Sequence, residues 1–144
     1  MAAIQFPHHP LGPGQFTAIV KDNNGEPSSV LEAGEKFEIR CEWKISRLAA
    51  LLLGGRWKVA AYVESIGPGP EKQIGLTKVV ALNGGTEYHA DIEVPAHTLP
   101  DLDPHAPAPE PSGAYKLVTL LTLENFGKLT DVAAVVEGPV LRIG

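Results

Sequence analysis

Apolar and polar residues alternate along much of the chain with a period of two, which is the pattern of β-strands that bury one face and expose the other. The clearest segment covers residues 37–45, where Phe37, Ile39, Cys41, Trp43 and Ile45 share one face and charged residues occupy the other. Further strands are expected at residues 15–21, 57–63, 76–82, 86–94, 114–123 and 132–143. The pattern therefore predicts an all-β chain of about seven strands, arranged as an antiparallel β-sandwich.

Turn residues separate these segments and indicate how the strands connect. Asn83, Gly84 and Gly85 accept positive φ, so the strands on either side of them are expected to form a hairpin. Gly138-Pro139 interrupts the last strand, where a bulge or kink is expected. Residues 95–112 hold six prolines, and because proline cannot donate to a ladder, this segment is predicted to be a long surface connection.

The length of 144 residues fits a single domain, preceded by a short segment of different composition. Residues 1–14 carry three prolines and two glycines and are predicted to be an extended arm without a fold of its own. So short a segment cannot bury enough surface to offset its ordering entropy, so it is expected to stay mobile or to dock along a neighbour. The sandwich is expected to cover residues 15–144.

An unusually apolar segment, residues 46–55, lies between two of the predicted strands. We expect a short helical turn within residues 46–54, which Ser46 caps and a pair of glycines ends. Such a turn is expected to fold Leu48, Leu51 and Leu52 onto the end of the core.

The alternative for the same segment is an exposed surface that binds a partner. Three consecutive leucines cannot all face inward from one helical turn, so Leu51 or Leu53 is expected to remain exposed and to favour association. The residues predicted for such an interface are Leu48, Leu51, Leu52 and Leu53.

Charge and composition exclude several classes of partner. The net charge of −5 leaves no basic stripe to neutralise phosphates, so nucleic acid and anionic membranes are not expected as partners. No run of about 18 apolar residues suits a membrane helix, and the first residues lack the basic and apolar regions of a signal peptide. The single cysteine, Cys41, cannot form an internal disulfide, which fits a reducing, cytoplasmic location.

One short segment resembles a known family. Glu110-Pro-Ser-Gly-Ala-Tyr-Lys-Leu117 resembles the Asp-Ser-Gly-x-Tyr-x-Cys segment of strand F in immunoglobulin domains, with matches at Ser112, Gly113 and Tyr115. In that family the tyrosine hydrogen-bonds back to the chain, and the cysteine bridges to strand B beneath a tryptophan of strand C. The resemblance implies an immunoglobulin-like antiparallel β-sandwich.

The same resemblance assigns Cys41 and Trp57 to the positions of the strand B cysteine and the strand C tryptophan. Pro111 and Leu117 depart from the family pattern, and Leu117 leaves Cys41 without a disulfide partner. The likeness is therefore one of architecture, which fibronectin type III-like sandwiches share, and it implies no particular function.

Candidate chemistry is sparse. Asp101, Asp103 and His105 are spaced two residues apart and can place oxygen and nitrogen donors around one cation, but a solvated acidic loop is the favoured explanation. No serine stands in a Gly-x-Ser-x-Gly context, and Cys41 is expected to point into the core. We therefore expect neither a cofactor nor an enzymatic activity.

The leading hypothesis is a non-catalytic structural or adaptor protein that acts through protein–protein contacts. Its partner is either another protein or further copies of the same chain in a self-assembled complex. The alternative is a ligand- or metal-binding domain that uses residues 95–112.

Overall fold

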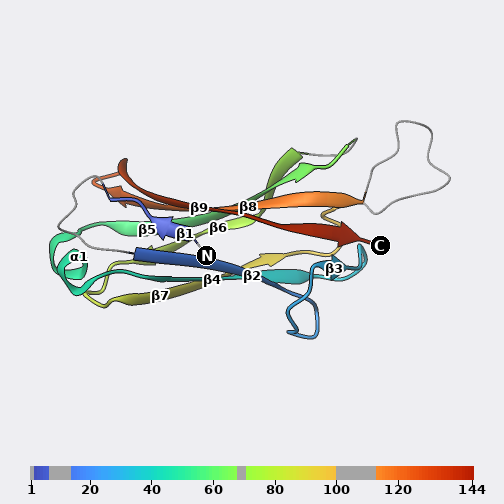
Figure 1. Cartoon of the computed structure of the whole chain (residues 1–144), viewed down its shortest axis with the longest axis horizontal. Helices are drawn as coiled ribbons and strands as arrows, with labels where there is room; N and C mark the ends of the chain where they lie inside the picture. Colours follow the sequence, from blue (N-terminus) through green and yellow to red (C-terminus); the bar gives the residue numbers. More distant parts are fainter. Residues whose placement is uncertain (1, 7–13, 68–70, 100–112) are drawn as a thin grey trace.

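The computed structural model describes residues 2–6, 14–67, 71–99 and 113–144, which form two β-sheets packed face to face (Figure 1). The four-stranded sheet has the order β1 (Ala2–Ile4), β2 (Gly14–Lys21), β4 (Phe37–Lys44) and β7 (Glu87–Val94). The five-stranded sheet has the order β3 (Val30–Leu31), β9 (Lys128–Ile143), β8 (Ala114–Asn125), β5 (Arg56–Ser65) and β6 (Glu71–Ala81). All pairs are antiparallel except β3 with β9. The predicted antiparallel β-sandwich is confirmed, with seven long strands and the two short strands β1 and β3.

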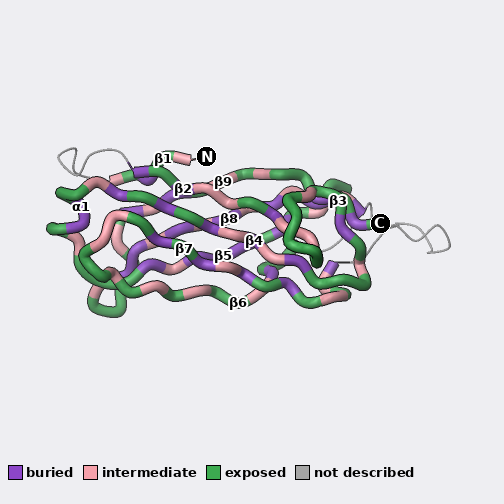
Figure 2. The backbone as a smooth tube through the Cα atoms, turned by 90° about the horizontal axis from the view of Figure 1, so that it is seen from below, coloured by how far each residue is buried: buried purple, intermediate pink, exposed green. Residues whose placement is uncertain are grey.

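The core lies between the sheets because both are amphipathic with a period of two. Figure 2 shows buried residues alternating with more exposed ones along the strands. Trp43 of β4 stands at the centre of an aromatic cluster with Phe16, Trp57 and Tyr88, whose ring centroids lie 5.9 to 6.2 Å from its own. Cys41 is fully buried as predicted, and burial raises the pKa of its thiol to about 12. The thiol is therefore packed as a small apolar group.

The predicted hairpin around Asn83-Gly84-Gly85 is wrong, because β6 and β7 belong to different sheets. The Asn83 Oδ1 atom accepts a hydrogen bond from the Gly85 amide at 2.8 Å, and the Tyr88 hydroxyl donates to the Gly85 carbonyl at 2.9 Å. These bonds fix a turn that carries the chain from one sheet to the other. Strand β7 alternates into the core without pairing with β6, while β6 contributes only Ile74 and, in part, Val80 to that core.

The two strands do approach each other along one side of the sandwich. Gly75 of β6 has φ +67°, and a Cβ atom there would lie 2.5 Å from Ile92 Cγ2 and 2.8 Å from the Glu93 carbonyl oxygen of β7. Only glycine fits this contact without displacing backbone. The glycine therefore lets the edges of the two sheets close over the core.

The expectation that residues 1–14 have no regular structure is also wrong in part. Residues Ala2–Ile4 form β1 and pair with β2, and the side chain of Ile4 is buried in the core. Gln5 extends this contact by exchanging backbone hydrogen bonds with Ala133 of β9. The pairing supplies the burial that the segment would lack alone. Residues 7–13 lie outside the described part of the chain.

The expected bulge in the last strand is confirmed. In the β8–β9 ladder, Lys116 lies opposite Val140 and Val118 lies opposite Glu137. Gly138 and Pro139 therefore share the position opposite a single residue of β8, which is the two-against-one count of a β-bulge. In the part of the chain that the structure describes, no helix is long and apolar enough to span a bilayer.

Candidate functional site

The helix α1 (Arg47–Leu52) forms where the sequence predicted it, and the Ser46 Oγ atom caps it by accepting a hydrogen bond from the Ala49 amide at 3.0 Å. Its inward face consists of Ala49 and Ala50, which are buried, and Leu53 packs partly against the core just beyond its end. Residues four apart share one face of a helix, so burial of Ala49 places Leu53 on the same side.

The three leucines of α1 therefore face outward. Leu48, Leu51 and Leu52 are exposed, and the exposed fraction of Leu51 reaches 73%. The prediction that these leucines fold onto the core is wrong. The small side chains of Ala49 and Ala50 occupy the inward face of the helix and let it lie close to the sandwich.

The turn between β8 and β9 adds two apolar residues to the same end of the molecule. Phe126 has a φ of 53° at the tip of this turn and is 96% exposed, and Leu129 follows it on β9. A Cβ atom at Gly55, which closes the connection from α1, would lie 2.0 Å from the Glu124 carbonyl oxygen. Figure 1 shows α1 and the β8–β9 turn at the end of the sandwich opposite the C-terminus.

We name this feature the apolar end surface. Its members are Leu48, Leu51, Leu52, Phe126 and Leu129. Sequence reasoning missed the last two, although a phenylalanine in a turn otherwise made of Asn, Gly and Lys was a signal for them.

Cationic side chains border the apolar end surface. Arg47 belongs to α1 and Lys128 is the first residue of β9, and neither forms an ion pair with another described residue. Nearby, the buried carboxylate of Glu124 accepts a hydrogen bond from Arg56 Nη2 at 2.8 Å and is ion-paired with Lys58. The apolar end surface therefore lies in a local excess of positive charge, although the whole chain is acidic.

Glu124 gives stability a defined pH dependence. Hydrogen bonds from Lys58 and then Arg56 lower its pKa below the ordinary value of 4.5. Because the folded pKa is the lower one, this stabilisation is complete above the unfolded pKa and is lost as the pH falls through the folded pKa. We expect the wild type to be more stable than Glu124→Gln at neutral pH. Urea unfolding between about pH 7 and about pH 2 should show this difference shrinking with acid, and a constant difference would contradict the assignment.

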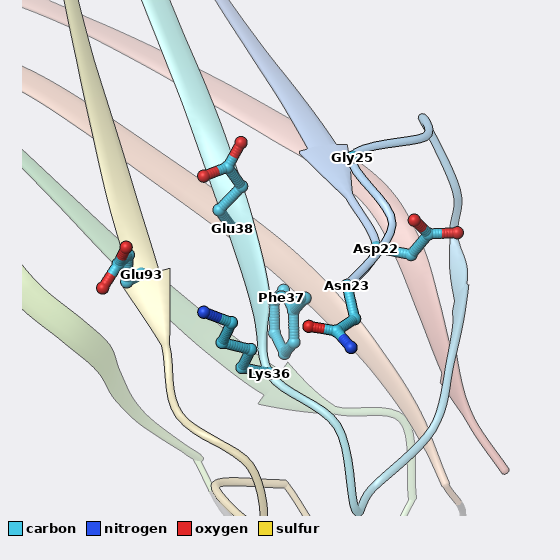
Figure 3. A pocket seen from close by; sticks show the side chains of 7 residues that line it. All are labelled: Asp22, Asn23, Gly25, Lys36, Phe37, Glu38 and Glu93. Carbon is cyan, nitrogen blue, oxygen red and sulfur yellow. The ribbon is translucent and has the colours of Figure 1, made fainter.

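A charged pocket of about 170 Å³ lies toward the other end of the sandwich (Figure 3). Its lining residues are Asp22, Asn23, Gly25, Lys36, Phe37, Glu38 and Glu93. The Asp22 Oδ1 atom accepts hydrogen bonds from the amides of Asn24 and Glu26, so this carboxylate serves the turn after β2. Figure 3 shows Asp22 and Glu93 on opposite sides of Phe37, with their carboxylates directed apart. The pocket therefore keeps the carboxylates of Asp22 and Glu93 apart, whereas Glu38 of β4 lies directly opposite Glu93 of β7.

The metal hypothesis rests on residues that the structure does not describe, since Asp101, Asp103 and His105 fall in the undescribed segment 100–112. Among the residues that are described, no three histidine, cysteine, aspartate or glutamate side chains gather to hold a metal ion. The ligand- or metal-binding role of residues 95–112 stays a prediction.

Comparison with known proteins agrees with the fold. No family model and no curated protein matches the sequence. Two crystal structures of a β-glucosidase from Listeria innocua, in complex with gluconolactone and with isofagomine, are similar to this chain with TM-scores of 0.51 and 0.50. Each is 14% identical to it, and the match covers 91% of this chain and 16% of the β-glucosidase chain. At this identity the likeness shows a shared sandwich fold alone.

Proposed function

We propose that this chain is a non-catalytic structural or adaptor module that binds another protein through the apolar end surface. The observation that supports the proposal is that exposed apolar side chains of α1 and of the β8–β9 turn lie at the same end of the sandwich (Figure 1). An apolar patch bordered by polar groups is a usual sign of a protein interface. A cytoplasmic location is part of the proposal, because a lone buried thiol suits a reducing compartment.

The chemistry of the apolar end surface favours a particular partner. Arg47 and Lys128 border it without ion-pair partners among the described residues, so an acidic segment with apolar anchors would complement it in charge. Phe126 and the helix leucines offer the anchors on this side of the contact, since burial of one such side chain is worth about 1.5–3 kcal/mol. Aromatic residues in the centre of an interface often carry much of its affinity.

The test compares two substitutions at equal exposure. Leu52 on α1 is 65% exposed and Val30 on β3 is 66% exposed, so Leu52→Ser and Val30→Ser should both leave folding intact. We expect Leu52→Ser to weaken binding of a protein from the source cell by about tenfold or more, and Val30→Ser to leave it unchanged. Each variant is cross-linked to its partners in an extract of the source cell, and quantitative mass spectrometry measures how much of each partner it binds.

Phe126→Ser provides a second test on the other element of the apolar end surface, and it should reduce recovery of the same protein. If the wild type and all three variants recover the same proteins in the same amounts, the proposal is contradicted. Equal melting temperatures of the variants exclude misfolding as the cause of a loss.

A further inference from the structure

The outward faces of the two sheets differ in chemistry. On the four-stranded sheet, every outward position of β4 and β7 carries a charged or imidazole side chain. The outward face of the five-stranded sheet is instead apolar at its centre. The apolar residues there are Ala60 and Tyr62 of β5, Val118 and Leu120 of β8, and Ala133 and Val135 of β9. We name this set the outer apolar face.

The register makes the outer apolar face continuous. Ala60 lies opposite Leu120, and Leu120 lies opposite Val135, so these three side chains form the central row across β5, β8 and β9. Tyr62 and Val118 are paired in the row on one side. An antiparallel sheet with one face on the core ordinarily presents polar residues on the other, so this row is expected to be covered in the working protein.

Charged residues border the outer apolar face at both ends. Toward α1, Arg56 and Lys58 share the single carboxylate of Glu124. Toward the other end, Glu64 of β5 pairs in register with Lys116 of β8, and Lys116 forms an ion pair with Glu137 at 3.2 Å. The outermost charges at that end are Glu71 on β6 and Arg142 on β9. With Lys128 and Asp131 of β9 also counted, the end toward α1 has three cations against two carboxylates and is net basic, and the other end is net acidic.

We infer that the outer apolar face binds a second copy of this chain, with the two sheets face to face and their strands antiparallel. Homodimers most often have a two-fold axis, and the charges select between the two axes that keep the strands of both copies aligned. The first axis runs along the central row, so it lies parallel to the sheet and perpendicular to the strands. Rotation about this axis places Arg56 opposite Glu64 of the second copy. It also sets Glu124 against Lys116 of the second copy.

The other axis runs parallel to the strands along β8 and gives the opposite result. Rotation about this axis places Glu124 opposite Glu124 of the second copy and Lys116 opposite Lys116 of the second copy, so like charges meet at both positions. Like charges across an interface disfavour that pairing. The charge pattern therefore supports one dimer geometry, in which Leu120 meets Leu120 and Val135 meets Val135.

The size of the face indicates a reversible dimer. Three strands about 4.8 Å apart and five rows of side chains about 6.8 Å apart, from the row of Arg56 to the row of Glu64, give on the order of 500 Å² per copy. A standard stable interface buries about 800 Å² per partner. We therefore expect the monomer and dimer to interconvert, with a dissociation constant of about 10 µM or weaker. The inference uses a different surface from the apolar end surface and does not depend on it.

The test measures mass against concentration by sedimentation equilibrium, from about 10 µM to about 1 mM. The wild type should pass from 15.3 kDa toward twice that mass. Val135→Lys should raise the dissociation constant by about tenfold or more, because two ammonium groups then meet at the two-fold axis. The matched control is Ile19→Lys on the outward face of the four-stranded sheet, since Ile19 is 43% exposed and Val135 is 45% exposed.

Glu64→Arg tests the direction of the strands, because it opposes Arg56 of the second copy in the proposed geometry and should weaken the dimer. A wild type that stays at 15.3 kDa at about 1 mM overturns the inference. If Val135→Lys and Ile19→Lys change the dissociation constant equally, the assigned face is wrong. If Glu64→Arg leaves the dissociation constant unchanged, the proposed strand orientation is wrong. Capture of a partner by the apolar end surface should be the same for Val135→Lys and wild type, so the two proposals fail separately.

Discussion

Replacing Trp57 with alanine is expected to lower the free energy of unfolding by about 3–5 kcal/mol. Trp57 is fully buried in β5, and its ring stands edge-on to that of Trp43 at a centroid distance of 6.1 Å. The substitution removes the contact between the two sheets at their aromatic centre and leaves a cavity there. Since small domains are stable by about 5–15 kcal/mol, urea unfolding should show a large part of the total lost.

Trp57→Phe is the control for this prediction. The indole nitrogens of Trp43 and Trp57 are buried and make no hydrogen bond with the described residues. Phenylalanine therefore removes ring volume without removing a hydrogen bond, and its effect should be clearly smaller than that of alanine. If Trp57→Phe destabilises the protein as much as Trp57→Ala, the ring packing is not the source of the stability.

Gly55→Ala is expected to destabilise the protein by about 2–6 kcal/mol, as the sum of backbone strain and a steric collision. Gly55 has φ +108°, and the added Cβ atom would lie 2.0 Å from the Glu124 carbonyl oxygen. That oxygen belongs to the backbone of β8 and cannot move without disturbing the ladder with β5. Chemical unfolding of the variant measures the loss.

Gly84→Ala separates the two contributions. Gly84 also has positive φ, at +80°, but an added Cβ atom there meets nothing within 4 Å. Its expected loss is the conformational part alone, about 1–2 kcal/mol. Equal losses for the two variants would show that the contact between Gly55 and Glu124 is looser than described.

Much of the fold could be predicted because alternation reports directly on which residues face the core. Residues 37–45 are the best example, since Phe37, Ile39, Cys41, Trp43 and Ile45 are all buried. Alternation does not report which sheet a strand joins. Strands β6 and β7 flank a turn with hairpin-type residues, and nothing in the hydropathy of either strand shows that they join different sheets.

The candidate site was predictable only where local sequence determines it. The Ser46 cap and the position of α1 follow from neighbouring residues, and both were expected. The side of this short helix that faces the core depends on the distance between the helix and the sandwich. That distance is set by residues far away in the sequence. The contribution of Phe126 depends on a turn that is more than 70 residues from α1 in sequence but adjacent in space. The contact of Gln5 with Ala133 of β9 depends likewise on a distant strand.

Strand β9 is 16 residues long, and two short segments occupy its outer edge. Val30 and Leu31 pair with it near the C-terminal end, and Gln5 pairs with Ala133 toward the other end. Pro139, between these contacts, has no amide hydrogen to donate. A foreign strand approaching this edge therefore meets backbone groups already paired at Ala133 and at residues 142–143, with a proline between them, which limits templated aggregation. Loss of the first five residues would uncover Ala133 and open one end of the edge to strand addition.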